Sequence, residues 1–114
     1  MKFGVNYTPS HGWFHAWLDP DWGGIDNDLK QISELGMDHV RSFPIWPYLQ
    51  PNRTWINKKG VADVRRMVHI AGEHGLDAYV DVFQGHLSSF DFLPSWLVTW
   101  HAGNMFTDAD AVAA

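Results

Sequence analysis

The stretch Glu34-Leu35-Gly36-Met37-Asp38-His39-Val40 decides the fold, because it returns 39 positions later as Glu73-His74-Gly75-Leu76-Asp77-Ala78-Tyr79. Each copy has the pattern of a helix end, a glycine that stops the helix, and the entry to a β-strand. A strand-like segment, Phe3-Gly4-Val5-Asn6-Tyr7, precedes the first copy. The repeat therefore predicts the order strand, helix, strand, helix, strand, with parallel strands.

Hydrophobic periodicity places the elements around this repeat. The predicted strands span residues 3–7, 39–43 and 78–83, and the last is an almost continuous apolar run typical of parallel sheets. The predicted helices span residues 25–35 and 61–73. We expect one apolar stripe on each helix to be buried: Ile25, Leu29, Ile32 and Leu35 on the first, and Val61, Val64, Val68 and Ala71 on the second.

The chain has features of the front of a longer protein. Thr107 and the carboxylates after it have the pattern of a helix start close to the last residue, Ala114. Three parallel strands also leave an unpaired sheet edge, which natural proteins avoid. Eight units of roughly 39 residues come to about 310, so we expect residues 1–114 to form the first three βα units of one (β/α)8 TIM-barrel domain. An open doubly wound sheet is the alternative, but residues 7–12 lack its usual glycine-rich phosphate loop.

Composition excludes several classes of function. The formal charge is −5 and the Lys and Arg residues are scattered, which argues against a nucleic-acid partner. No apolar run approaches the length of a membrane span, so no membrane partner is expected. The chain has no Cys, which excludes disulfides and thiolate metal sites. Strand residues directly follow Met1 with no signal peptide before them, so we expect a cytoplasmic protein.

Strand alternation assigns the polar side chains to one face of the sheet. Asn6, His39, Arg41 and Asp81 should point into the barrel, while the residues that alternate with them face the helices: Val5, Val40, Val80 and Val82. Arg41 lies at the end of its strand, where it can donate hydrogen bonds to a catalytic carboxylate and keep that group ionised. The alternative is a structural ion pair with Asp81, since both charges need partners when buried.

Three short motifs lie along the strands: Gly4-Val5-Asn6 within the first, Val40-Arg41 followed by Phe43-Pro44 at the end of the second, and a third strand that ends near His86. Together they resemble the opening of the retaining glycoside hydrolase clan with (β/α)8 barrels, with cellulase- and mannanase-like (family 5-like) members the closest match. The resemblance implies that Asn6 and Arg41 line the sugar subsite and that Arg41 supports the nucleophile. His86 either matches a substrate-binding position of the clan or is an ordinary loop histidine.

Enzymes of this type hydrolyse β-linked oligo- and polysaccharides with two glutamates, one acid/base and one nucleophile, and need no cofactor. This chain has only two Glu residues, Glu34 and Glu73, both at predicted C-terminal helix ends and therefore at the bottom of the barrel. The resemblance implies that the catalytic glutamates follow strands 4 and 7, which this chain does not reach. We therefore expect residues 1–114 alone to be inactive.

Seven Trp residues lie largely in the segments that follow the strands, where the barrel mouth is expected. Indole faces stack on pyranose rings, and indole N–H groups can meet sugar hydroxyls. We expect two or three of them to bind an oligosaccharide or polysaccharide substrate, and assign this role to Trp13, Trp46 and Trp96. The remaining Trp residues are expected to pin loops onto the barrel rim.

The histidines do not form a metal motif. His11 and His15 lie in a loop context, and the set His69, Glu73 and His74 lacks zinc-protease spacing. Two hypotheses remain: the N-terminal part of a retaining β-glycosidase, or a non-catalytic carbohydrate-binding or interaction protein that oligomerises to cover its sheet edge. A sugar isomerase or amidohydrolase is the weakest, because its metal ligands are missing from the three strand ends. The sequence leaves the sugar, the linkage and the oligomeric state open.

Overall fold

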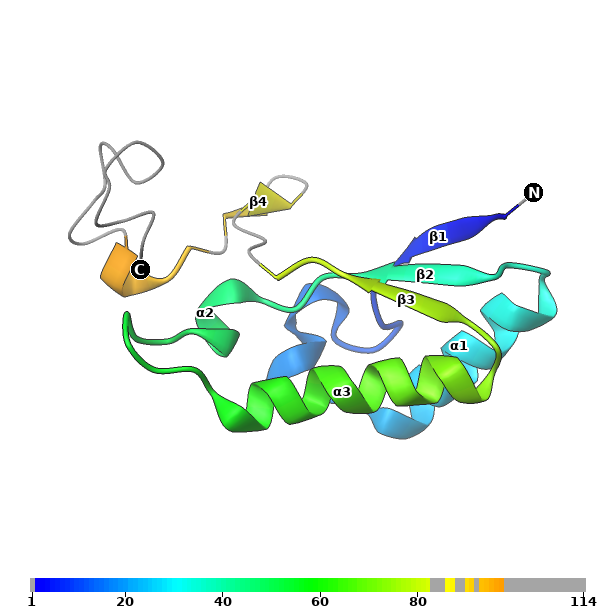
Figure 1. Cartoon of the computed structure of the whole chain (residues 1–114), viewed down its shortest axis with the longest axis horizontal. Coiled ribbons are helices and arrows are strands. Elements are labelled where there is room, and N and C mark those ends of the chain that lie inside the picture. Colours follow the sequence, from blue (N-terminus) through cyan, green and yellow to red (C-terminus); the bar gives the residue numbers. More distant parts are fainter. Residues whose placement is uncertain (1, 83–85, 88–89, 92, 98–114) are drawn as a thin grey trace.

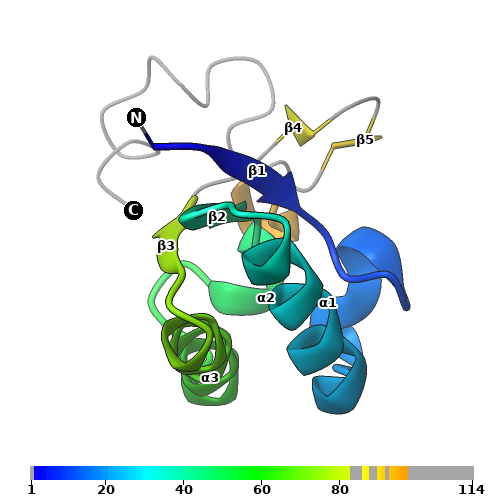
Figure 2. The ribbon, with the colours of Figure 1, turned by 90° about the vertical axis from the view of Figure 1, so that its right-hand side faces the viewer.

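The computed structural model describes residues 2–82, 86–87, 90–91 and 93–97. The elements in chain order are β1 (Gly4–Tyr7), the 3-10 helix η1 (Trp13–Leu18), α1 (Trp22–Glu34), β2 (His39–Ser42), α2 (Trp46–Leu49), α3 (Lys58–Glu73), β3 (Asp77–Val80), β4 (His86–Leu87) and β5 (Phe90–Asp91). The first three strands form a parallel sheet in the order β1-β2-β3, and α1 and α3 cover one face of it (Figures 1 and 2). The predicted order of strands and helices and the parallel pairing are confirmed.

Both copies of the repeat end a helix with a glycine of positive φ. Gly36 and Gly75 have φ angles of +91° and +74°, which favour glycine and stop α1 and α3. The next Asp of each copy then opens the sheet pairing. The Asp38 N–H donates to the Phe3 carbonyl at 2.8 Å, and the Asp77 N–H donates to the Asp38 carbonyl at 2.9 Å. The repeat therefore places β2 beside β1 and β3 beside β2 in the same way.

Both long helices begin one turn earlier than the periodicity predicts. Asp21 caps α1, since its Oδ1 accepts from the Gly24 N–H at 3.1 Å. Asn57 caps α3, since its Oδ1 accepts from the Lys59 N–H at 3.1 Å. Asp and Asn are preferred at this position because they satisfy the unpaired N–H groups of the first turn. Both first turns contain glycine, Gly23 and Gly24 in α1 and Gly60 in α3, and the regular apolar spacing starts only after them, so it placed the helix starts too late.

The core lies between the sheet and the two helices, and each predicted stripe is confirmed only in part, Ala71 and the half-buried Val64 being the correct members on α3. On α1, Ile25 and Leu29 are buried as predicted, but Leu35 is the C-cap residue and is 77% exposed. On α3, Val61 and Val68 are each 40% exposed. The residues that α3 buries are Gly60, Asp63, Met67, Ile70 and Ala71. This buried face contains Asp63, which interrupts the apolar spacing. A search for regularly spaced apolar residues therefore does not identify the face as buried.

The other face of the sheet carries polar side chains in register. Asn6 pairs with Arg41, and Arg41 pairs with Tyr79, and all three side chains are exposed on the face away from the helices. β2 and β3 are shorter than predicted, and Val82 lies past the end of β3 and is 50% exposed instead of facing the helices. The Asp81 N–H still donates to the Ser42 carbonyl at 3.1 Å, which extends the ladder by one residue.

Four short elements were not predicted. η1 follows β1, α2 follows β2, and β4 pairs antiparallel with β5. Figure 1 shows α2 and β4 beyond the C-terminal ends of β2 and β3. The predicted helix start at Thr107 and the predicted strand end at Phe83 lie outside the described residues. Within the described part of the chain, every helix is too short or too polar to cross a membrane.

Candidate functional site

An ion pair joins the ends of β2 and β3. The Arg41 Nε donates to the Asp81 Oδ1 at 3.2 Å, and its Nη2 donates to the Asp81 Oδ2 at 2.5 Å. The two side chains are 50% and 27% exposed. The hydrogen bond from Arg41 to Asp81, together with the charge of that carboxylate, raises the pKa of Arg41. The ion pair considered as the structural alternative for Arg41 is therefore present.

A second contact places the guanidinium of Arg41 over the ring of Phe43. The Arg41 Cζ lies 5.1 Å from the centroid of the Phe43 ring, and Phe43 is buried. The buried Trp17 holds Phe43 in turn, because its Nε1 donates to the Phe43 carbonyl at 3.1 Å. The pair with Asp81 uses two of the five N–H donors of an arginine side chain. The geometry is thus compatible with a second carboxylate partner, and support of a nucleophile stays a prediction.

His39 and Asn6 lie on the same face of the sheet as Arg41, and they differ in how many contacts hold their side chains. His39 has its Nδ1 2.6 Å from the Asp38 Oδ1, and its ring meets the Tyr79 ring edge-on at 5.1 Å. These contacts give His39 a structural role at the start of β2. Asn6 lies exposed beside Arg41 in register, and its role in binding sugar stays a prediction.

Two indoles meet just beyond the strand ends. The rings of Trp46 and Trp96 have centroids 6.4 Å apart and planes at 86°, and we call this pair the aromatic corner. The Trp46 Nε1 donates to the Gln50 Oε1 at 3.0 Å, and the Trp96 Nε1 donates to the Gln50 carbonyl at 3.0 Å. Gln50 therefore holds both indoles, Trp46 through its side-chain oxygen and Trp96 through its carbonyl. The role of Trp46 and Trp96 in binding sugar stays a prediction, with both N–H groups donating to Gln50 in this structure.

The remaining predicted sugar-binding residues and tryptophans are distributed over several elements. Trp13 lies in η1, is 45% exposed, and stacks on the Phe14 ring at 4.0 Å. Trp22 begins α1, where its ring lies 4.5 Å from the Arg66 guanidinium, which makes it part of the helix layer. Trp55 is 53% exposed. His86 begins β4, but its side chain, like all of Trp100, lies outside what the structure describes.

Both glutamates lie where the sequence placed them. Glu34 ends α1 and Glu73 ends α3. Since these helices run opposite to the strands, their ends lie at the N-terminal side of the sheet, away from Arg41. Glu34 pairs with Lys30 at 4.0 Å and Glu73 with His69 at 2.9 Å.

The histidine near the end of α3 pairs with a carboxylate of α1. The His74 Nε2 lies 2.7 Å from the Asp26 Oδ1, which links the two helices. Among the described residues, no three His, Asp or Glu side chains gather in a way that could hold a metal ion.

Sequence reasoning missed Gln50, which connects the two indoles. The available signal is its spacing from Trp46, because residues four apart are neighbours on a helical turn. The bond to Trp96 spans 46 residues, and no local pattern indicates it.

Solved structures resemble this chain along nearly its whole length, while no family model matches it. A glutamate-to-alanine variant of GH5_18 from Bifidobacterium longum subsp. longum ATCC 55813, in complex with Manβ1-4GlcNAc, is 98% identical with a TM-score of 0.94, over 99% of this chain and 27% of that one. A glutamate-to-alanine variant of GH5_18 from Streptomyces cattleya, also with Manβ1-4GlcNAc, is 57% identical with a TM-score of 0.92, over 98% and 27%. The exo-β-1,4-mannosidase Op5Man5 from Opitutaceae bacterium strain TAV5 is 26% identical with a TM-score of 0.91, over 99% and 20%.

These similarities and the parallel βα units show which kind of protein the chain resembles: the glycoside hydrolases that are built on a (β/α)8 barrel. Within that class the chain resembles the N-terminal part of cellulase- and mannanase-like family 5 enzymes, GH5_18 proteins among them. It spans about a quarter of their length, 27%, and has the fold of the N-terminal three βα units. The resemblance and the fold class predicted from the sequence are confirmed.

Proposed function

We propose that this chain is part of a retaining glycoside hydrolase that cleaves β-linked mannosides, and that its residues form one wall of the sugar site. One observation carries the proposal: the Arg41–Asp81 pair lies at the C-terminal ends of β2 and β3, and the aromatic corner lies just beyond the same edge. Active sites of (β/α)8 enzymes lie at this edge. The 98% identical and 57% identical relatives are seen with Manβ1-4GlcNAc, which supports a β-mannoside as the substrate.

Arg41 would act on the nucleophile from its fixed position. A retaining enzyme needs one carboxylate ionised to attack the anomeric carbon and a second carboxyl group to protonate the leaving oxygen. A guanidinium beside the attacking carboxylate lowers the pKa of that carboxylate and keeps it charged. Glu34 and Glu73 end helices at the opposite side of the sheet, so the residues described here bind and orient, and both catalytic carboxylates come from other strands of the barrel.

The aromatic corner would bind the sugar by stacking. Trp46 and Trp96 are half-buried and nearly perpendicular, so they can cover two sides of one pyranose ring. Stacking favours the apolar face of the ring, while the hydroxyl groups are left to polar residues such as Asn6. The aromatic corner would thus supply most of the affinity for the sugar, and the polar face of the sheet that carries Asn6 would recognise its hydroxyl groups.

The test uses a complete barrel, made by joining residues 1–114 to the remaining strands of the unsubstituted GH5_18 protein from Bifidobacterium longum subsp. longum ATCC 55813, which is also 98% identical (the joined barrel). We expect it to release mannose from Manβ1-4GlcNAc with retention at the anomeric carbon, read by NMR of the first-formed product. Residues 1–114 alone should show no turnover. Inversion, or no turnover of any β-mannoside by the joined barrel, would overturn the proposal.

The role of Arg41 has its own readout. In the joined barrel, Arg41→Met should reduce kcat/KM by at least about tenfold, which corresponds to about 1.4 kcal/mol. Without the guanidinium the pKa of the nucleophile rises, so the acid limb of the pH profile should move to higher pH. Arg41→Lys keeps the charge but loses the planar fork, and it should shift the acid limb less. An unchanged acid limb in Arg41→Met would exclude this role.

A further inference from the structure

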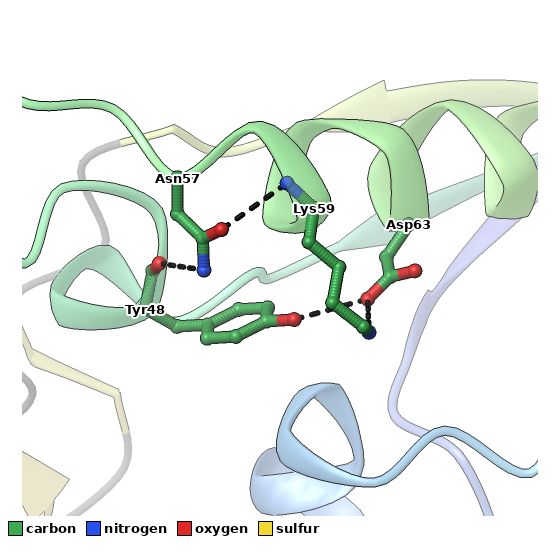
Figure 3. Close-up of polar contacts among 4 residues, drawn as sticks. All are labelled: Tyr48, Asn57, Lys59 and Asp63. Carbon is green, nitrogen blue, oxygen red and sulfur yellow. Dashed lines mark hydrogen bonds and ion pairs between the residues drawn. The ribbon is translucent and has the colours of Figure 1, made fainter.

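A polar cluster joins α2 to the first turns of α3 (Figure 3). The Tyr48 Oη donates to the Asp63 Oδ2 at 3.0 Å, and the Lys59 Nζ donates to the same oxygen at 2.9 Å. The Asn57 Nδ2 donates to the Tyr48 carbonyl at 3.1 Å, while its Oδ1 caps α3 at the Lys59 N–H. We call Tyr48, Asn57, Lys59 and Asp63 the α2 anchor.

The anchor holds α2 tightly against α3. Asp63 is 9% exposed, and a carboxylate this buried needs the two donors it receives. A Cβ added to Gly60 would lie 3.1 Å from the Leu49 Cδ2 and 3.3 Å from the Tyr48 Cε1, so the helices touch at a glycine. The Asn57 N–H also donates to the Leu49 carbonyl at 2.8 Å. Main chain, side chains and close packing therefore fix the same short helix.

Electrostatics keep the anchor in its donating state at neutral pH. Burial raises the pKa of Tyr48, and its hydrogen bond to Asp63 adds to this effect. The hydrogen bond to Asp63 raises the pKa of Lys59. Tyr48 thus keeps its proton and Lys59 keeps its charge, and both continue to donate to Asp63.

The helix that the anchor fixes carries the aromatic corner. Trp46 is the first residue of α2, and Gln50 follows its last residue. Gln50 is 6% exposed, and its Nε2 donates to the Arg53 carbonyl at 3.2 Å, so its amide is held at both ends. Trp96 reaches α2 through the Gln50 carbonyl. A shift or rotation of α2 therefore changes the angle between the two indoles.

We propose that Gln50 and the α2 anchor are positioning residues for sugar stacking: the anchor fixes α2, Gln50 fixes the indoles on it, and together they set the affinity of the corner for a sugar ring. This inference rests on the proposed function. Its physical basis is that a binding surface displaced by about 1 Å loses much of its interaction with the ligand.

The test compares conservative variants in the joined barrel. Tyr48→Phe removes only the hydroxyl that reaches Asp63, and Gln50→Met removes the acceptor of Trp46 while keeping the length of the side chain. Gln50→Glu restores an acceptor oxygen. Ser33→Ala is the matched control, because the Ser33 Oγ donates to the His74 carbonyl at 2.7 Å between α1 and the end of α3, away from α2.

Two readouts separate positioning from stability. With Manβ1-4GlcNAc, Tyr48→Phe and Gln50→Met should raise KM about two- to tenfold, the effect of one lost hydrogen bond, with kcat within about twofold. Gln50→Glu should recover most of the loss, and Ser33→Ala should lower stability without changing KM. The near-UV circular dichroism of the paired indoles should change in Gln50→Met and not in Ser33→Ala.

The outcomes are distinguishable. If the unsubstituted joined barrel fails to bind or cleave the disaccharide, the proposed function fails, but the circular dichroism still decides whether Gln50 orients the indoles. If KM and the dichroism are unchanged in Gln50→Met and Tyr48→Phe at temperatures well below unfolding, the residues are merely structural and the inference is wrong. Equal KM changes in Ser33→Ala would also overturn it.

Discussion

Removing the Asp63 carboxylate should destabilise the fold by a predictable amount. The Tyr48 hydroxyl loses its acceptor, which costs about 0.5–1.5 kcal/mol because the group is part-buried. The Lys59 ammonium is 69% exposed and returns to water, so the lost ion pair contributes little. Asp63→Ala should therefore lower the free energy of unfolding by about 0.5–1.5 kcal/mol, the share of the Tyr48 hydroxyl. Asp63→Asn keeps an oxygen for Tyr48 and should lose less than half of that.

Urea unfolding of the joined barrel measures these differences, with Lys59→Met as the control that removes only the ion pair. A double-mutant cycle of Tyr48→Phe and Asp63→Ala isolates the hydroxyl–carboxylate contact and should give a coupling of about 0.5–1.5 kcal/mol. A coupling near zero, or equal losses in Asp63→Asn and Asp63→Ala, would refute the reasoning that Asp63 acts as the acceptor of Tyr48.

Three further predictions concern substitutions at Trp46, at Tyr7, and at the glycines Gly75 and Gly72. Trp46→Ala in the joined barrel should weaken binding of Manβ1-4GlcNAc about tenfold by calorimetry, and unchanged affinity would exclude a stacking role. Burial and the hydrogen bond to Asp28 raise the pKa of Tyr7 above its usual value of 10.0, so unfolding releases its proton more easily and stability falls above about pH 10 by up to about 1.4 kcal/mol per pH unit. Tyr7→Phe should flatten this fall, and an identical alkaline slope would contradict it. Gly75→Ala should cost about 1 kcal/mol because φ is +74°, whereas Gly72→Ala, inside α3 with nothing within 4 Å of the added Cβ, should stabilise by about 0.5–1 kcal/mol; equal effects in thermal unfolding would disprove this contrast.

The sequence was sufficient for the features that depend on local backbone rules. The positive φ of Gly36 and Gly75 is a property of glycine itself, so the repeat could be read directly as two helix ends and two strand entries. Strand alternation likewise placed Asn6 and Arg41 on the face away from the helices. These rules suffice for the order and direction of the elements.

The features that depend on tertiary contacts were missed. The buried face of α3 contains Asp63, which is tolerated there only because Tyr48 and Lys59 donate to it. α2 is a single turn, too short for periodicity to indicate. The aromatic corner depends on Gln50 contacting a residue 46 positions away, so the sequence suggested Trp46 and Trp96 separately but not their contact.

The most direct test of the account is a crystal structure of the joined barrel with Manβ1-4GlcNAc. The account predicts a sugar ring against the faces of Trp46 and Trp96, and the Arg41 guanidinium within hydrogen-bonding distance of a glutamate from another strand. A sugar bound away from this edge, or Glu34 or Glu73 beside its anomeric carbon, would contradict it.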